Sequence, residues 1–196
     1  MEFYVNGEKI DVSLEDEKTV GDVLKSFEIM IEQNNAAVIG ISLNGEKISA
    51  ETFDEHTKQP LKEDDTFEFT IVTHQMIFDS FKRLASLFKE LAIQMEQIPV
   101  DLQTGRDKEV STAIKNLADN IEEFCHIAAL ASIFDDYSEI KIQGMFFKEF
   151  FTDFSKILND FEHALKIHDT VTVGDLAEYE ICPRLIEIAK ALENLV

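Results

Sequence analysis

Apolar and polar residues repeat with two different periods along this chain. In the first 74 residues, short stretches repeat with a period of two, as at Phe3 and Val5 with their polar neighbours, which is typical of strands that bury one face. From Thr73–Gln75 onward, apolar residues recur at spacings of four and three, the period of an amphipathic helix. The pattern predicts an α+β protein with one domain over residues 1–74 and a helical domain over residues 75–196.

Two hairpins, one helix and a final strand are predicted in the first domain. The residues Asn-Gly-Glu-Lys-Ile occur twice, starting at Asn6 and at Asn44, and Asn-Gly favours the positive φ angles of a type I′ hairpin turn. Between them, apolar residues at helical spacing predict a helix over residues 19–33, with Thr19 as its N-cap. Residues 67–71 again alternate apolar and polar side chains, which predicts the last strand.

Four apolar stripes of helical period follow in the second domain. They predict helices that cover residues 77–98, 110–131, 147–168 and 181–195. Pro99 and Gly105 mark the first predicted connection, residues 135–142 the second and residues 169–174 the third. Pro183 predicts a kink or break in the last helix, because proline removes a helical donor. Short connections between helices of this length favour an up-down four-helix bundle.

The order of the elements in residues 1–73 resembles that of ubiquitin-like β-grasp domains. The similar segments are the first strand at Met1–Val5, the start of the helix at Thr19–Phe27, the third strand and turn at Ile41–Lys47, and the closing strand within Leu61–Phe69. The resemblance implies a β-grasp fold that offers a general binding scaffold. It covers only the first domain, and the helical domain resembles no family in this way.

Two functional features of the ubiquitin-like family have no counterpart here. Conjugated members end in a flexible Gly-Gly tail, whereas this strand continues through Val72–His74 into a helix. The positions that match ubiquitin's apolar recognition face are polar, at Ser42, Glu68 and Thr70. The resemblance therefore implies a fold, and it implies neither conjugation nor a ubiquitin-receptor partnership.

The chain is strongly acidic, with 39 acidic and 18 basic residues and a formal net charge of −21. Such a surface repels phosphate backbones and anionic lipids, which argues against nucleic-acid and membrane partners. The hydrophobic content of 45%, including 16 Phe, is too high for a disordered acidic segment. We expect a folded protein whose partners are basic or amphipathic proteins. A weaker alternative is an acidic mimic of nucleic acid that occupies a nucleic-acid-binding protein.

The sequence predicts a cytoplasmic location and no thiol chemistry. The N-terminus has no basic region followed by an apolar stretch, and no window is apolar enough for a membrane span. Cys125 and Cys182 lie far apart within helical patterns and lack Cys-x-x-Cys spacing. We therefore expect both to be buried, reduced thiols.

Two carboxylate-x-x-His motifs in the helical domain are candidates for a metal site. Glu123 and His126 lie on the second predicted helix of the bundle, and Asp160 and His163 lie on the third. Such motifs can build a two-metal site when their side chains point into a bundle. On a helical wheel, however, all four lie away from the apolar stripes. The sequence predicts no metal and no cofactor.

His163 is also the candidate residue for an alternative function, histidine phosphotransfer. His163-Ala164-Leu165-Lys166 resembles the His-x-Leu-Lys core of histidine phosphotransfer domains. In that family an exposed imidazole accepts a phosphoryl group and the nearby lysine steadies its charge. The resemblance implies catalytic roles for His163 and Lys166. The family's glycine after the lysine is replaced by Ile167, and an ordinary exposed histidine is the competing interpretation.

The third helix of the bundle is rich in phenylalanine, and two interpretations of its first half are open. Phe146 and Phe150 widen the apolar stripe beyond one seam. Either they pack on the first domain or on another helix, or they form an exposed groove for a partner helix, rimmed by Glu149 and Asp153. A second copy of the chain could occupy the same face. Since no catalytic set is assembled, we expect a non-enzymatic interaction protein, an adaptor or chaperone-like binder.

Overall fold

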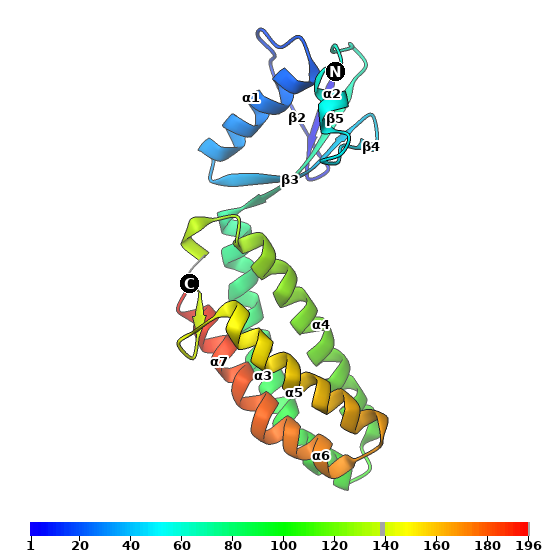
Figure 1. The fold of residues 1–196 in the computed structure, drawn as a ribbon, viewed down its shortest axis with the longest axis vertical. Coiled ribbons are helices and arrows are strands. Elements are labelled where there is room, and N and C mark those ends of the chain that lie inside the picture. The colour runs from blue at the N-terminus through cyan, green and yellow to red at the C-terminus, as the bar shows by residue number, and fades with distance from the viewer. Residues whose placement is uncertain (138–139, 196) are drawn as a thin grey trace. The chain divides into compact units, whose positions relative to one another are not determined.

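The structure is a computed structural model, and it describes residues 1–137 and 140–195 (Figure 1). The chain divides into two compact units, Met1–Met76 and a second unit that begins at Ile77. The first is built on a five-stranded sheet and the second on helices, so the predicted α+β class is confirmed. Within the described ranges, no helix combines the length and the apolar composition that crossing a bilayer requires.

Both predicted hairpins are confirmed. β1 (Glu2–Val5) pairs with β2 (Glu8–Ile10), and β3 (Ala36–Leu43) pairs with β4 (Glu46–Lys47), each pair antiparallel. The turns hold φ at 50° and 84° in Asn6-Gly7 and at 53° and 80° in Asn44-Gly45. Positive φ at both central residues is the geometry of a type I′ turn, whose twist matches that of the strands it joins.

The central strand of the sheet is β5 (Thr66–Thr73). It lies parallel to β1 and antiparallel to β3, which gives the order β2-β1-β5-β3-β4. Phe67 and Phe69 are buried on one face of β5, whereas Glu68 and Thr70 are exposed on the other. The alternation predicted for this strand is therefore confirmed.

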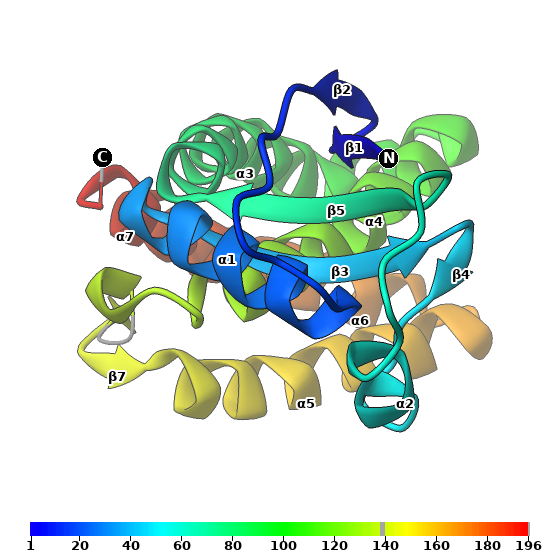
Figure 2. The ribbon, with the colours of Figure 1, turned by 90° about the horizontal axis from the view of Figure 1, so that it is seen from above.

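One helix covers the apolar face of the sheet. Figure 2 shows α1 (Val20–Gln33) lying across β3, and the Phe27 ring of α1 stacks on Phe69 with centroids 3.6 Å apart. The helix begins with a capping box, as predicted. The Thr19 hydroxyl accepts from the Asp22 backbone N–H, and the Asp22 carboxylate accepts from the Thr19 backbone N–H at 2.9 Å.

A β-bulge in β3 decides which of its side chains face α1. Val38 pairs with Ile71 and Gly40 with Thr70, so Ile39 is an extra residue that the partner strand does not match. An extra residue shifts the alternation by one position. Val38 before the bulge and Ile41 after it therefore pack against the same core, while Ile39 is 41% exposed.

In the second unit, α3 (His74–Gln103) begins directly after β5, where the period was predicted to change. The prediction that Pro99 belongs to a connection is wrong, because the helix continues through it. A proline inside a packed helix costs one backbone hydrogen bond but need not end the helix. Gly174 packs closely here, since a Cβ on it would lie 3.4 Å from Pro99 Cβ.

The next connection contains a hairpin that the sequence pattern did not predict. After α4 (Asp107–Ala131) and a 3-10 turn at Asp135–Tyr137, β6 (Lys141–Ile142) pairs antiparallel with β7 (Met145–Phe146). Its turn holds Gln143 and Gly144 at φ of 54° and 77°. α5 (Phe147–Lys166) follows immediately.

The last helical run is longer than predicted and contains a π-helical segment. α6 (Thr170–Asp175) begins inside the predicted third connection, because Asp169 caps it by accepting from the Thr172 N–H at 3.1 Å. A π-helix over Leu176–Ile181 leads into α7 (Cys182–Glu193). The irregularity expected at Pro183 thus lies in the turn before it, where the Cys182 N–H donates to Ala177, five residues earlier.

Phe124 of α4 is the centre of the aromatic core in the helical unit. Its ring is fully buried and contacts rings from α3 and α5. The nearest of these are Phe147 at 5.2 Å, Phe151 at 5.3 Å and Phe88 at 5.4 Å between centroids. One side chain therefore joins three helices.

Replacing Phe124 should destabilise the helical unit far more than replacing an exposed phenylalanine. We expect Phe124→Ala to lower the free energy of unfolding by about 3–5 kcal/mol, because it leaves a cavity between three helices. The matched control Phe146→Ala, at a half-exposed ring, should cost less than about 1 kcal/mol. Urea unfolding followed by circular dichroism at 222 nm measures both, and equal losses would contradict this account of the core.

The capping box should make the first unit sensitive to acid. The Thr19 hydroxyl, and then the backbone N–H groups of Lys18 and Thr19, hold the pKa of Asp22 below its ordinary value. A depressed folded pKa contributes stability above the unfolded pKa, near 4, and that contribution is lost as pH falls through the folded pKa. Asp22→Asn should therefore flatten the loss of stability below about pH 4.

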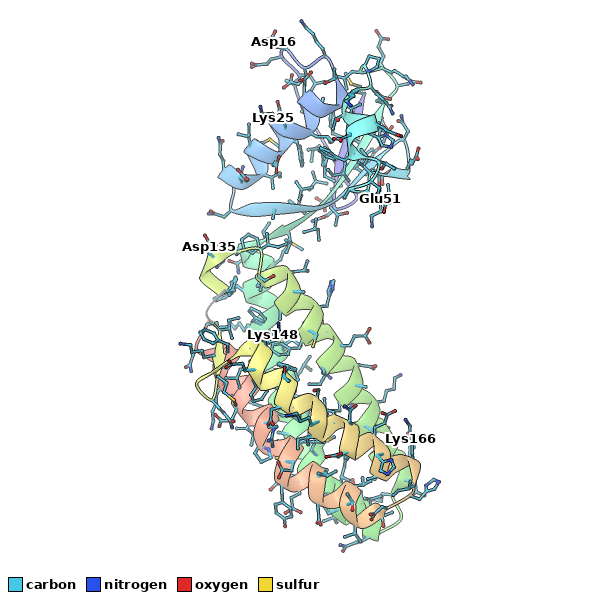
Figure 3. The ribbon with its side chains drawn as sticks, in the orientation of Figure 1. Asp16, Lys25, Glu51, Asp135, Lys148 and Lys166 are labelled. Atoms are coloured by element: carbon cyan, nitrogen blue, oxygen red, sulfur yellow. The ribbon has the colours of Figure 1, made fainter. Side chains whose placement is uncertain are left out.

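Thermal melts between neutral pH and strongly acidic pH test this expectation. Asp16→Asn, which removes an exposed carboxylate outside the capping box, is the control and should leave the acid dependence unchanged (Figure 3). If the stability of Asp22→Asn falls with decreasing pH as steeply as that of the wild type, protonation of Asp22 does not contribute to the acid dependence.

Candidate functional site

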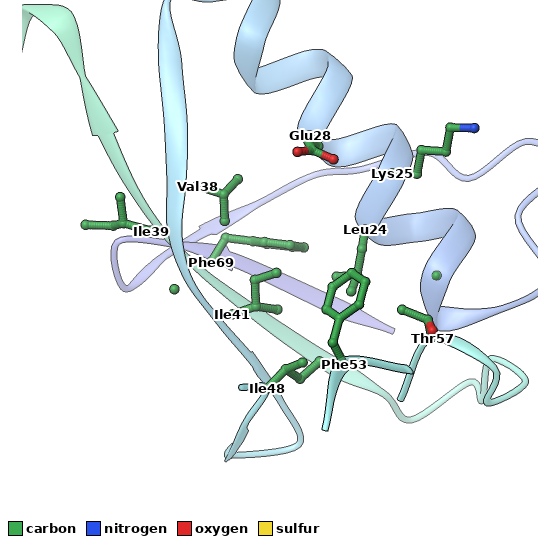
Figure 4. A pocket seen from close by; sticks show the side chains of 12 residues that line it. Leu24, Lys25, Glu28, Val38, Ile39, Ile41, Ile48, Phe53, Thr57 and Phe69 are labelled. Carbon is green, nitrogen blue, oxygen red and sulfur yellow. The ribbon is translucent and has the colours of Figure 1, made fainter. Parts of the chain in front are cut away.

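An open groove of about 570 Å³ lies between α1 and β3 in the first unit. We call it the α1–β3 groove. Its apolar lining comes from α1, β3, β5 and the segment after β4, namely Leu24, Val38, Ile39, Ile41, Ile48, Phe53 and Phe69 (Figure 4). The β-bulge contributes directly to this lining, because it turns both Val38 and Ile41 toward the helix.

A short helix closes one end of the groove. α2 (Phe53–Thr57) lies against the first turn of α1, where Gly21 permits the approach. A Cβ on Gly21 would lie 2.9 Å from the Thr57 carbonyl oxygen, which is closer than real Cβ contacts allow. This packing holds Phe53 at the mouth of the groove, where its ring is 42% exposed.

The outer edge of β3 borders the same groove. β4 pairs only with Ser42 and Leu43, and the Ile48 N–H donates to the Ile41 carbonyl at 2.9 Å. In the described part of the chain, no strand lies beside the outer edge of Ala36–Gly40. Unpaired strand edges are templates for pairing with another chain. The groove therefore combines apolar side chains with free backbone groups.

Two exposed, charged side chains of α1 line the groove. Figure 4 shows Glu28 on the side of the helix that faces β3, whereas Lys25 extends away from the strand. The surrounding unit is acidic as well, because residues 1–74 contain 17 acidic and 6 basic residues. The two charges of the lining offset each other, so the negative charge around the groove comes from the rest of the unit.

The lining of the groove is mostly apolar. It contains no His or Cys, and its polar side chains are Lys25, Glu28 and Thr57. Throughout residues 1–137 and 140–195, no group of three or more His, Cys, Asp and Glu side chains is placed to hold a metal ion. An open apolar groove with few polar groups is suited to contact with another molecule's side chains.

The structure separates the four residues predicted to form a partner-binding face. Phe150 is only 2% exposed and packs against Phe151 and Phe154. Phe150 is therefore buried and does not line an exposed groove, and the ring contacts described for it are with its own helix. Phe146 is 50% exposed, and the Lys141 ammonium lies 4.8 Å from its ring centroid.

The two acidic residues of that predicted face have different surroundings. Glu149 is exposed. Asp153 binds Arg184 of α7 at 3.2 Å, and the same guanidinium donates to the Glu180 carboxylate at 2.6 Å and to the Glu180 carbonyl at 3.0 Å. Asp153 therefore helps to join α5 to the last helical run.

The residues of the phosphotransfer alternative lie on the surface of α5. His163 is exposed, and Lys166 binds Glu162 one turn away at 2.7 Å while its chain projects outward (Figure 3). The structure thus leaves His163 exposed and pairs Lys166 with a carboxylate of the same helix. No second functional group is placed beside the imidazole by the contacts described for this face.

The four residues of the carboxylate-x-x-His motifs do not belong to any group of three or more side chains placed to hold a metal ion in the described part of the chain. His126, Asp160 and His163 are exposed, and Glu123 forms a two-pronged ion pair with Arg83 of α3. Glu123 is therefore already bound to a cation of the protein itself. This pair joins α3 to α4.

The two cysteines differ in exposure. Cys182 is buried, and burial is the main cause that raises the pKa of its thiol. Cys125 is exposed, contrary to the prediction that both thiols are buried. The helical pattern placed it beside Phe124, but adjacent residues on a helix point in different directions.

Family comparisons match both units without assigning an activity. Residues 79–191 match the family model described as a domain of unknown function, DUF8042. The chain belongs to this family. Residues 1–73 match a second model, described as the TP0873 N-terminal domain. The first match covers most of the helical unit and the second covers nearly all of the sheet unit, ahead of the DUF8042 domain.

A curated protein is similar to this chain over its whole length. It is an uncharacterized protein of Treponema pallidum (strain Nichols), 23% identical over 195 residues, which span 100% of this chain and 98% of the relative. No solved structure gave a significant match. The similarity to this relative therefore extends over both units of the chain.

Sequence analysis did not identify the α1–β3 groove. Its decisive features are a bulge at Ile39, a close approach at Gly21 and an exposed ring at Phe53. One signal was available, since an isolated glycine such as Gly40 within a strand pattern often marks a bulge. The free edge of β3 carries no such signal, because it depends on the shortness of β4.

Gly21→Ala tests the packing that shapes the groove. Helix propensity alone predicts a gain of up to about 1 kcal/mol for glycine to alanine within a helix. We expect instead a net loss of about 1–3 kcal/mol, because the added Cβ meets the Thr57 carbonyl. Chemical denaturation measures the change in unfolding free energy. A stabilised variant would contradict this expectation, because it would show that α2 can move to accommodate the added Cβ.

Proposed function

We propose that this protein is a non-enzymatic protein-binding module that engages its partner through the α1–β3 groove. The observation that carries the proposal is the coincidence of an open apolar groove with an unpaired strand edge. Either feature alone is common on protein surfaces. Together they offer side-chain pockets and backbone hydrogen bonds to one ligand, which is the requirement for recognising a polypeptide.

The proposal includes finer assignments of the two units. The order β2-β1-β5-β3-β4, with one helix across the sheet, supports a ubiquitin-like β-grasp fold for the first unit. In the second, α3, α4, α5 and the run α6–α7 support a four-helix bundle, in which the π-helix accommodates Pro183. Both folds serve as scaffolds for binding in many unrelated proteins, so the assignment of function rests on the groove and not on the folds.

Electrostatics favour a basic protein partner. A chain with net charge −21 attracts cationic partners over distances of about a Debye length, roughly 10 Å, at moderate salt. The same charge disfavours nucleic acid, anionic membranes and a second copy of the chain. The strongest association is therefore expected with a partner that presents lysine or arginine near apolar residues.

Site-specific photo-crosslinking tests the proposed binding surface. A benzoylphenylalanine in place of Phe53 puts the reactive group at the mouth of the groove, and the same residue in place of Tyr179, exposed on the helical unit, is the control. We expect Phe53 to give a discrete adduct in native extract that excess wild-type protein competes away. The partner, once purified, should bind at least about tenfold more weakly at high salt.

Three results would contradict the proposal. One is that the probe at Phe53 gives no adduct that excess wild-type protein competes away. Another is that the probe at Tyr179 gives as much adduct as the probe at Phe53. The third is turnover of a small molecule by the purified protein that persists after the groove is altered.

A further inference from the structure

The free edge of β3 and the α1–β3 groove form one continuous surface. On the side of β3 that faces away from β5, no described strand pairs with the backbone groups of Ala36–Gly40. Val38 from the same stretch lines the groove. Across the groove stands α1, with Leu24 at its floor and Glu28 at its rim. A ligand in the groove would therefore contact the strand edge and the helix at the same time.

We propose that this surface binds a basic, extended peptide segment of a partner protein, which adds a strand to β3 beside Ala36–Gly40. The inference rests on the proposed function and specifies how the partner is held. Edge addition satisfies the backbone groups of both chains and gives affinity without a long interface. Five residues of strand extend roughly 17 Å, so the recognised segment is short.

The groove determines which side chains the added strand carries. Side chains alternate between the two faces of a strand, so every second residue of the ligand points toward α1. There it meets Leu24, Val38 and Ile41, which are apolar. Valine or isoleucine at these positions would fill the groove, whereas the residues between them face away from α1.

The bulge at Ile39 makes this edge selective. A bulge twists a strand and interrupts regular pairing, which protects an edge from flat, non-specific aggregation. A ligand must therefore gain contacts beyond its backbone hydrogen bonds. The groove supplies those contacts on one side of the bulge, at Val38, and on the other, at Ile41.

Charge identifies the occupant as a basic segment rather than a second copy. Glu28 lies at the rim facing β3, within a unit that has 17 acidic and 6 basic residues. Pairing two β3 edges would bring two chains of net charge −21 together. Lysine or arginine flanking the apolar residues of a ligand would instead be attracted to the rim.

The test uses the full-length protein and a defined peptide. The probe is an amidated peptide with the sequence Lys-Lys-Thr-Val-Thr-Ile-Thr-Lys-Lys, titrated into ¹⁵N-labelled protein at low salt. We expect shift changes and slowed amide exchange concentrated at Ala36–Gly40, with smaller changes at Leu24 and Phe53. Shift changes confined to β2 or to the helical unit would overturn the proposal, and so would no binding by the folded protein.

Two backbone-methylated peptides test whether a strand is formed. One carries N-methyl groups on Val and Ile, and the other carries them on the three Thr residues. Since alternate N–H groups of an edge-added strand face its neighbour, one of the two should lose at least about tenfold in affinity and the other should lose less. Equal binding of both to wild-type protein, at the strength of the parent, would overturn strand addition.

A matched pair of variants tests the charge. Glu28→Lys reverses a charge at the groove, and Glu8→Lys makes the same change on β2, at the opposite edge of the sheet, where Glu8 is exposed. We expect Glu28→Lys to weaken the parent peptide about fivefold and Glu8→Lys to leave it within about twofold. Equal weakening by both would show that only net charge matters and would overturn the assignment of the rim.

These outcomes can be separated from failure of the proposed function. If strand addition fails but the Phe53 crosslink persists, the groove still binds a protein by another mode. If the Phe53 crosslink is absent as well, the groove is not the binding surface at all.

Discussion

The burial of Phe67 and Phe69 on one face of β5 sets the register of the strands around it. Phe67 stacks on Phe3 of β1, and Phe69 stacks on Phe27 of α1. A slip of one residue in β5 would turn both rings to solvent and bring Glu68 into the core, so this register is strongly favoured. Because β5 has a neighbour on each side, its register also fixes where β1 and β3 begin and end.

The bulge in β3 follows from the same constraint. Against the fixed register of β5, the sequence of β3 would direct Val38 and Ile41 to opposite faces if it alternated regularly. The extra residue at Ile39 allows both to face α1. The cost is an interrupted ladder at the outer half of the sheet, and the groove lies at that interruption. The shape of the groove is thus a consequence of how β3 packs its apolar side chains into the core.

The elements that sequence analysis predicted correctly depend on local chemistry. The hairpins follow from Asn-Gly dipeptides, and α1 follows from the cap at Thr19 and its apolar stripe. The incorrect predictions concern residues whose structure depends on packing between elements. Pro99 stays helical, with Gly174 packed against it. Phe150 is buried, with Phe151 and Phe154 of its own helix against its ring. Single-sequence periodicity gives the apolar face of a helix but not what covers it.

The packing of the aromatic residues of α5 supports the proposal that the binding surface lies on the sheet rather than on the helices. Phe147, Phe151 and Phe154 are used to join α5 to Phe124 and to each other, which leaves Phe146 as the half-exposed ring of that segment. A single ring over a lysine offers little area to a partner. The strand edge offers backbone groups, whose energy depends on pairing and not on area. The proposed mode of binding, in which a short basic segment pairs with this edge, therefore requires no large exposed apolar patch.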